Sequence, residues 1–287
     1  ECEMIKVSCF NKMGDVVYAL PVLRALWRLQ GEKIHLLLSG SAYQLAPLLW
    51  EQPYIGEVEL EDTKAHATMP IARGAIFPHW NWYRPDEGYN LSLQPMYFTD
   101  EAPIVWTQCY MQAAGVTELT ESDCVTLPSL VNHRRWLDGI DVDCAGTRQS
   151  KPKTIIIAPE TDTLDELVPD IWQSIVNEVV DHGHEPIMVG TRRVSKFYRC
   201  TDLRGLTSVP VLARLIAESR GFIGAHSFPW HLARHSETPA VCLQTWREGL
   251  RRCLPVDTSY TWIEPQEYLS AVSVVLERCA QHEQVPA

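Results

Sequence analysis

The sequence predicts an α/β protein with a parallel sheet in each half of the chain. Short apolar runs alternate with amphipathic stretches of helical spacing in both halves, and this alternation is typical of parallel sheets covered by helices on both faces. A weakly patterned segment at roughly 128–152, containing glycine, serine and proline, separates the two halves. The length of 287 residues also suits more than one domain. We therefore expect domains at 1–145 and 146–287.

Each element of the first half follows from its local pattern. An apolar run, Ile5–Phe10, predicts the first strand, and apolar residues spaced along one helix face from Val16 to Trp27 predict the helix after it. Further runs and helical patterns predict strands at 36–38, 58–60 and 89–94 and helices at 42–50 and 104–114. The stretch 62–100 is too aromatic for a solvated linker, so we expect it to be ordered.

The second half repeats the alternation. Continuous apolar runs predict buried strands, and amphipathic stretches predict the helices between them. The predicted strands are 154–158, 186–189, 221–225 and 240–243, and the predicted helices are 169–182, 209–219, 229–235 and 265–279. The last of these is a C-terminal helix.

Composition and charge narrow the class of protein. Hydrophobic residues make up 46% and charged residues 21%, which excludes a disordered or collagen-like chain. Lysine and arginine number 25 against 36 aspartates and glutamates. The net charge of −11 disfavours nucleic-acid binding through a broad positively charged surface. No apolar stretch approaches the roughly 20 residues of a membrane helix, and no secretory signal is visible. We expect a cytoplasmic protein whose nine cysteines, without a C-x-x-C pair, are reduced and mostly buried.

Gly14 and Asp15 lie between the first apolar run and the first helical pattern. Glycine permits close approach to the backbone, and the N-terminus of a helix presents unpaired N–H groups to an anion. Asp15 is also a sensible helix cap, a role worth about 1 kcal/mol. From the residues alone, a capping role and a functional role both stay open for Asp15.

A second candidate segment is 221–233, where a predicted strand runs into a helix that begins at Pro229. Proline suits the first helical position, and His226 or Ser227 could cap the helix, so that N–H groups and the helix dipole would point at a phosphate. Open α/β sheets bind ligands in such loops at the carboxyl ends of their strands. An ordinary capped connection is the alternative interpretation.

Together, these segments resemble glycosyltransferase family 9, the lipopolysaccharide heptosyltransferases and their relatives. Residues 13–26 are similar to the opening of that family, in which Gly-Asp is followed by apolar residues and then Leu-Pro-x-Leu-Arg-Ala-Leu. Segments 203–208, 226–233 and 238–241 follow the donor-binding half of the family in order, and 89–94 resembles its Tyr-Asp-apolar strand. The resemblance implies the GT-B fold, in which two Rossmann-like domains face a central cleft.

The resemblance also implies an activity and a set of site residues. The activity is that of an inverting, metal-independent glycosyltransferase that moves a sugar from a nucleotide-diphosphate sugar to a hydroxyl acceptor, with no cofactor besides that co-substrate. Asp15 corresponds to the proposed general base of the family, because a carboxylate there could take the proton of the acceptor hydroxyl. The expected donor-binding residues are His226, Ser227, Phe228, His231, Glu160, Thr161 and Arg192. The expected acceptor-binding residues are Asn11, Met13, Gly14, His79, Trp80 and Trp82. The acceptor would be a glycan, a lipid-linked sugar or a modified nucleic acid, and the enzyme could act as a monomer.

The chain departs from the family pattern at two places. His226-Ser227-Phe228 stands where the family usually has Asp-Ser/Thr-Gly, which exchanges an acid for a titratable imidazole. The lysine that balances phosphate charge in heptosyltransferases has no counterpart in 160–168, which contains four acids instead. His226, Arg192 or Arg193 could compensate for the missing lysine.

Several alternatives stay open. A phage-type glycosyltransferase acting on a hydroxymethylated DNA base would share the fold, although the net charge of −11 argues against it. A catalytically degenerate nucleotide-sugar-binding module is favoured by the altered loop and opposed by the retained Asp15, and an epimerase or hydrolase of nucleotide sugars is more remote. His231 and His235 are spaced to share a metal, but no Glu follows His231 as in H-E-x-x-H, so we expect no metal site.

Overall fold

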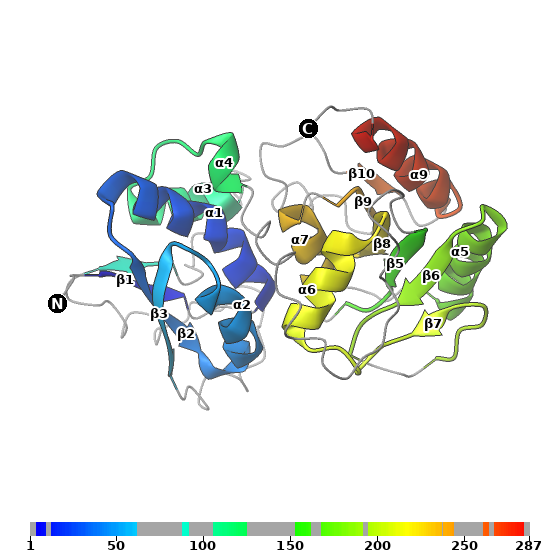
Figure 1. Ribbon diagram of the computed structural model, residues 1–287, viewed down its shortest axis with the longest axis horizontal. Coiled ribbons are helices and arrows are strands. Elements are labelled where there is room, and N and C mark those ends of the chain that lie inside the picture. Colours follow the sequence, from blue (N-terminus) through cyan, green and yellow to red (C-terminus); the bar gives the residue numbers. More distant parts are fainter. Residues whose placement is uncertain are drawn as a thin grey trace, which may run out of the picture. The chain divides into compact units, whose positions relative to one another are not determined.

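The computed structural model describes residues 4–9, 13–61, 88–91, 106–124, 153–161, 168–191, 195–236, 238–243, 261–263 and 267–283 (Figure 1). The chain divides into two compact units, with the described elements β1 to α4 in the first and β5 to α9 in the second. The expected boundary between 145 and 146 lies outside the described residues and stays a prediction.

The first unit is built on a 4-stranded parallel sheet with the strand order β3-β2-β1-β4. Its strands are β1 (Ile5–Cys9), β2 (Ile34–Ser39), β3 (Ile55–Glu61) and β4 (Tyr89–Asn90). Its helices are α1 (Met13–Gln30), α2 (Ala46–Trp50), α3 (Trp106–Ala114) and α4 (Glu121–Cys124). A continuous buried stretch of α1, from Asp15 to Leu23, anchors this helix, and α3 and α4 pack against it (Figure 1).

The second unit contains a 6-stranded parallel sheet with the strand order β10-β9-β8-β5-β6-β7. Its strands are β5 (Thr154–Ala158), β6 (Glu185–Met188), β7 (Thr201–Asp202), β8 (Gly221–Ala225), β9 (Ala240–Leu243) and β10 (Thr261–Ile263). Its helices are α5 (Pro169–Asp181), α6 (Val209–Glu218), α7 (Phe228–His235) and α9 (Ser270–Glu283). The alternating α/β pattern of both halves, with parallel sheets, is thereby confirmed.

Alternate residues of the central strands form a core beneath α5 and α9. Ile157 of β5 and Ile223 of β8 are 0% exposed and share a buried cluster with Trp172 of α5 and Val272 of α9. Burying each such side chain stabilises the fold by about 1.5–3 kcal/mol. The helices α6 and α7 pack against each other on the other side of the sheet (Figure 1), so helices cover both faces and the strands read as continuous apolar runs.

The structure differs from the predicted elements in short or irregular places. The predicted helix 42–50 is a 3₁₀ helix, η1 (Gly40–Leu45), followed by α2, because Pro47 suits only the first turn of a new helix. The C-terminal helix begins at Ser270 rather than at 265. The elements α4, β7 and β10 were not expected, since two to four residues are too few to show a period.

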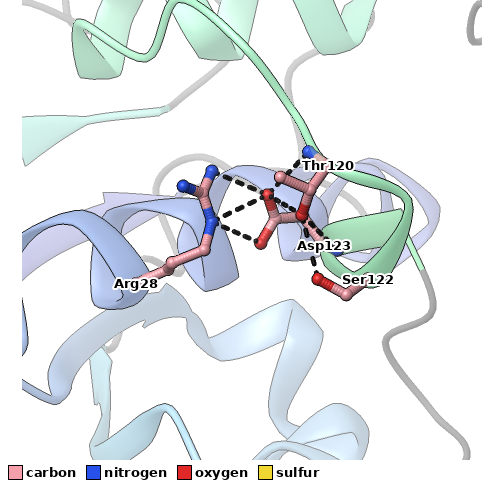
Figure 2. Close-up of polar contacts among 4 residues, drawn as sticks. All are labelled: Arg28, Thr120, Ser122 and Asp123. Atoms are coloured by element: carbon pink, nitrogen blue, oxygen red, sulfur yellow. Dashed lines mark hydrogen bonds and ion pairs between the residues drawn. The ribbon is translucent and has the colours of Figure 1, made fainter.

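A buried carboxylate fastens α4 to the last turn of α1 (Figure 2). The Arg28 Nε lies 3.2 Å from both carboxylate oxygens of Asp123, and Nη2 donates to Oδ2 at 2.9 Å. The backbone N–H and the hydroxyl of Thr120 donate to the same oxygen at 2.9 and 2.8 Å. Burial alone would raise the pKa of Asp123, but the hydrogen bonds from Arg28 and Thr120 outweigh it and hold that pKa below its ordinary value.

A cavity of about 350 Å³ opens beside this ion pair. Its lining residues are Arg24, Trp27, Arg28, Gly31, Ser122 and Asp123. At 1.5 Å per residue, Arg28 lies about 20 Å along α1 from Asp15. The cavity therefore lies at the end of α1 that is remote from the predicted catalytic residue.

Replacement of Asp123 by Asn should lower the free energy of unfolding by about 2 kcal/mol at pH 7. The pKa of Asp123 is lower in the folded than in the unfolded chain, so its stabilisation is present above the ordinary carboxyl pKa and is lost as the pH falls through the folded-state pKa. Urea unfolding of wild type and Asp123→Asn at pH 7, 5 and 3 should therefore show a shrinking difference. The control Glu59→Gln, in a pair whose carboxylate side chain is 59% exposed, should change stability much less. An equal difference at pH 7 and pH 3 would contradict this role of Asp123.

Candidate functional site

The loops at the carboxyl edge of the second sheet meet at a topological switch point. β5 is the first strand of this unit, and the chain continues to β6 on one side of it and later to β8 on the other. Open α/β sheets bind ligands in the crevice outside the carboxyl ends of such strands. Ala158 pairs with Gly224 where β5 and β8 end, so the loops that follow these two strands start side by side.

A hydrogen bond joins these two loops. The Thr161 hydroxyl donates to the backbone carbonyl of His226 at 3.0 Å, and Thr161 is buried. The Ser227 hydroxyl donates to the carbonyl of Ala225 at 3.2 Å. The expected side-chain cap by Ser227 is therefore wrong, because its hydroxyl is turned back toward β8 and makes no cap bond to α7.

The start of α7 suits an anion through its backbone. Ser227 holds the N-cap position with an extended conformation, φ −157° and ψ 174°, and Pro229 stands in the first turn. The first N–H groups of a helix have no intrahelical acceptor, and proline has no N–H at all. The Phe228 N–H and the positive end of the α7 dipole are thus available at the carboxyl edge of the sheet.

His226 lies at this edge in an aromatic cluster. Its ring centroid lies 5.4 Å from that of Trp230 and 5.0 Å from that of His231. Burial lowers the pKa of His226 to about 4, so at neutral pH it does not supply the positive charge that could replace the missing lysine. Its buried Nε2 has no hydrogen-bond partner among the described residues, and such an atom is costly unless another group satisfies it.

His231 lies within α7 and is buried. It is 4% exposed, and its ring packs against both His226 and Trp230. Burial, followed by the neighbouring His226, Arg234 and His235, lowers the pKa of His231. Its neutral imidazole therefore supports the ring of His226.

Glu160 connects the loop after β5 to the turn after β6. Its Oε2 accepts hydrogen bonds from the Thr191 N–H at 2.7 Å and from the Thr191 hydroxyl at 3.3 Å. Gly190 has a φ of +147°, and a Cβ at this position would lie 2.7 Å from Glu160 Oε2. Only glycine lets the carboxylate come this close to the backbone.

The sequence assigned no role to three residues around Glu160, namely Gly190, Thr191 and Arg204. Arg204 Nη1 lies 3.7 Å from Glu160 Oε1, although the two residues are 44 positions apart in the chain (204 − 160). The only sequence signal was that Arg204 lies within the segment 203–208 that resembles the donor-binding half of family 9.

In the first unit, Asp15 lies in the first turn of α1, directly after the predicted strand-to-helix loop. β1 has β2 on one side and β4 on the other, so this sheet also has a switch point at the strand that precedes Asp15. Asp15 is 8% exposed, and Met13 and Gly14 beside it are half-buried. This position fits both interpretations of Asp15: a carboxylate that interacts favourably with the dipole of α1, and a carboxylate at the edge of the sheet where ligands bind.

The remaining predicted residues lie outside the described part of the chain, and their roles stay predictions. They are Asn11, His79, Trp80, Trp82 and Arg192, together with the alternative Arg193. Within the described residues, no group of three or more His, Cys, Asp or Glu side chains could hold a metal ion. None of the described helices is long and apolar enough to cross a membrane. Cys9, Cys200, Cys242 and Cys279 are not joined in disulfides.

The two parallel sheets, each with a switch point, define an α/β protein of two compact units. No model of a protein family and no curated protein sequence matches the chain. Solved structures do match, and they show the fold of the GT-B glycosyltransferases, which confirms the fold expected from the resemblance to family 9.

Three of these structures illustrate the likeness. The ADP-heptose LPS heptosyltransferase II of E. coli is 13% identical, with a TM-score of 0.62 over 98% of this chain and 100% of that one. The glycosyltransferase family 9 protein of Veillonella parvula is also 13% identical, with a TM-score of 0.60 over 99% of this chain and 90% of that one. A protein described as a UDP-N-acetylglucosamine 2-epimerase of Listeria monocytogenes is 11% identical, with a TM-score of 0.56 over 99% and 91%. Since an epimerase shares the fold, the reaction has to be argued from the site.

Acid should destabilise the protein through His226. The pKa of His226 is about 4 in the folded chain against an ordinary 6.5, so the unfolded chain binds the proton more readily and stability falls as the pH drops from 6.5 to 4. At 1.36 kcal/mol per pH unit, the loss attributable to His226 is at most about 3 kcal/mol at pH 4. Urea unfolding between pH 7 and pH 4 should show a flatter slope for His226→Gln than for wild type.

Histidine NMR supplies an independent check on the same imidazole. The His226 ring signals, assigned from their absence in His226→Gln, should titrate near pH 4. A midpoint at or above 6.5 would contradict the burial of an uncharged ring at this position.

Proposed function

We propose that the protein is an inverting, metal-independent glycosyltransferase that moves a sugar from a nucleotide-diphosphate sugar to a hydroxyl acceptor. The observation that carries the proposal is the joined pair of loops at the switch point of the second sheet, where Thr161 holds His226 at the start of α7. This arrangement supports a diphosphate site, because it offers backbone N–H groups, a helix dipole and an unsatisfied imidazole nitrogen at one place.

The donor diphosphate would bind mainly to dipoles. The Phe228 N–H and the N-terminus of α7 face developing negative charge without carrying a formal charge themselves. The uncharged His226 offers one further hydrogen bond from its buried Nε2. As the bond between the sugar and the diphosphate breaks, these groups stabilise the electron pair that leaves with the diphosphate.

Asp15 would act as the general base. Its carboxylate takes the proton of the acceptor hydroxyl while the hydroxyl oxygen forms a bond to the anomeric carbon, on the face opposite to the departing diphosphate. The new glycosidic bond then has inverted configuration. Asp15 is only 8% exposed, and its place in the first turn of α1 puts the carboxylate at the carboxyl edge of the first sheet.

The names of the similar structures indicate a class of donor. The E. coli protein is an ADP-heptose enzyme, and the L. monocytogenes protein is named for a UDP-sugar. Both names contain a nucleotide-diphosphate sugar, which supports the same donor class here and makes ADP-sugars the first candidates.

A non-catalytic nucleotide-sugar-binding module is the second candidate. It is favoured by one observation: the altered loop places an uncharged, buried imidazole where the family usually has an acid. Such a module would bind the nucleotide through α7 but would show no transfer.

Nucleotide binding should raise thermal stability. A ligand that binds only the folded state stabilises it by RT ln(1 + [L]/Kd), so a panel of ADP, UDP, GDP and CMP, free and sugar-linked, should yield a shift with one base. The variant Thr161→Val removes the hydroxyl that holds the His226 carbonyl and should weaken binding about fivefold. The matched control Thr201→Val, at an exposed position on β7, should bind as wild type. No shift with any nucleotide would contradict the donor site.

Replacement of Asp15 by Asn should abolish transfer and leave donor affinity nearly unchanged. The amide keeps the size of the side chain but cannot accept the proton of the acceptor, and loss of a general base typically costs about 10²–10⁴-fold in rate. Product formation from the sugar nucleotide identified above measures the first effect, and calorimetric titration measures the second. The control is Asp181→Asn, which removes a carboxylate from the exposed pair with Arg199.

Two results separate the candidate functions. Donor binding without turnover in the wild type would favour the binding module. Intact turnover with weakened donor binding in Asp15→Asn would refute the role of Asp15 as base.

A further inference from the structure

Glu160 poses an electrostatic problem for a diphosphate site. It follows β5 directly, and the next residue, Thr161, bonds to the His226 carbonyl in the loop before α7. An uncompensated carboxylate beside that loop would repel the donor phosphates, since unit charges interact appreciably over several ångströms at a partly buried site. A carboxylate at this position therefore needs a cation beside it, and it should also make a contact that only an acceptor group can make.

Arg204 is the cation that the described residues place beside it. It is 2% exposed, and its Nη1 lies 3.7 Å from Glu160 Oε1. The guanidinium is held in place by a fork to Asp202, with Nε to Oδ1 at 3.0 Å and Nη2 to Oδ2 at 2.9 Å. Nη2 also donates to the Ser195 carbonyl, and the guanidinium carbon lies 4.8 Å from the centroid of the Phe197 ring.

The same pair binds together the turns after β6 and β7. Glu160 accepts the Thr191 N–H at 2.7 Å, and the Gly205 N–H, adjacent to Arg204, donates to the Gly190 carbonyl at 2.7 Å. Gly205 has a φ of +68°, and a Cβ there would lie 3.2 Å from the Thr191 carbonyl. The glycines at 190 and 205 thus let two turns approach closely around one carboxylate and one guanidinium.

We propose that Arg204 is a positioning residue for the donor site: its charge offsets that of Glu160 and holds this carboxylate on the Thr191 N–H, so that the loops after β5 and β6 keep a fixed shape and repel the diphosphate less. This inference rests on the proposed function, because it concerns the same nucleotide site. Glu160 then acts through the backbone of Thr191, and it contributes no contact to the donor itself.

The pair also accounts for the missing lysine. A lysine in the loop after β5 would be a single point charge, whereas here the loop carries an acid, Glu160, beside a guanidinium that a fork to Asp202 holds in place. The three groups together carry one net negative charge instead of the two that would remain without Arg204, and attraction for the phosphates comes from the dipole of α7. Removal of Arg204 alone should leave the Glu160 carboxylate repelling the donor, and removal of both charges should relieve that repulsion.

A double-mutant cycle tests this directly. The affinity for ADP and for adenosine, as the phosphate-free reference, is measured by calorimetric titration for wild type, Arg204→Gln, Glu160→Gln and the double variant. Arg204→Gln should weaken ADP binding about tenfold and adenosine binding hardly at all. Glu160→Gln, added to Arg204→Gln, should restore ADP binding to within about threefold of wild type. The control Arg199→Gln removes an exposed arginine that pairs with Asp181 and should have no effect.

Arg204→Lys covers the case in which Arg204→Gln fails to fold. It keeps the positive charge without the fork, and it should retain ADP affinity within about threefold. Unfolding in urea is recorded for every variant, because a merely structural Arg204 would lower stability with no selective loss of ADP affinity.

The outcomes are distinct. No rescue of ADP binding in the double variant, or equal losses for ADP and adenosine, would overturn the inference while the donor site stands. A tenfold loss in Glu160→Gln alone would overturn it too, since Glu160 would then contact the donor. Failure of wild type to bind any member of the panel of ADP, UDP, GDP and CMP, free or sugar-linked, would instead refute the proposed function, and the inference would fall with it.

Discussion

The pairing of β5 between β6 and β8 is the constraint on which the second unit depends. Residues Ile155 to Ile157 are buried and pair in register with both neighbours. Because all three strands are parallel, their carboxyl ends coincide at one edge of the sheet. The contacts from Thr161 to His226 and from Glu160 to Thr191 follow from this register. A slip of one residue would turn every buried side chain of β5 to the opposite face and would separate both contacts.

The electrostatics of this edge rest on neutral or compensated groups. His226 is uncharged at neutral pH because its ring is buried, and the charge of Glu160 is partly offset by Arg204, which it shares with Asp202. The hydrogen bonds that Arg204 donates to Asp202 are the largest effect on its pKa and raise it, so the positive charge of Arg204 is secure. In the proposed function, fixed dipoles at the start of α7 would provide the attraction for phosphate, and they would need no reorganisation when charge develops.

The regular elements could be predicted from the sequence because their periods extend over several residues. The strand from Thr154 to Ala158 and the helix that begins at Pro169 have such patterns, and the structure confirms them. The two-residue strand β7 carries no period, so the sequence does not indicate it. The role of Arg204 was hidden for the same reason, since its approach to Glu160 exists only once β7 pairs beside β6. Asp15, in contrast, was singled out from a local motif at the start of a helix; the structure places it in the first turn of α1, and its role as a base stays a prediction.

The presence of Glu160 gives a physical reason for an uncharged side chain at position 226. An aspartate at the position of His226, as in the usual family pattern, would add a second carboxylate next to the loop that already contains Glu160. Two carboxylates beside one diphosphate repel each other and the ligand, and only one of them could be matched by Arg204. A buried neutral imidazole keeps a hydrogen-bonding nitrogen at this position and adds no charge. If this edge binds phosphate as proposed, the acid at 160 and the imidazole at 226 are physically coupled, because an uncharged group at 226 limits the negative charge beside Glu160.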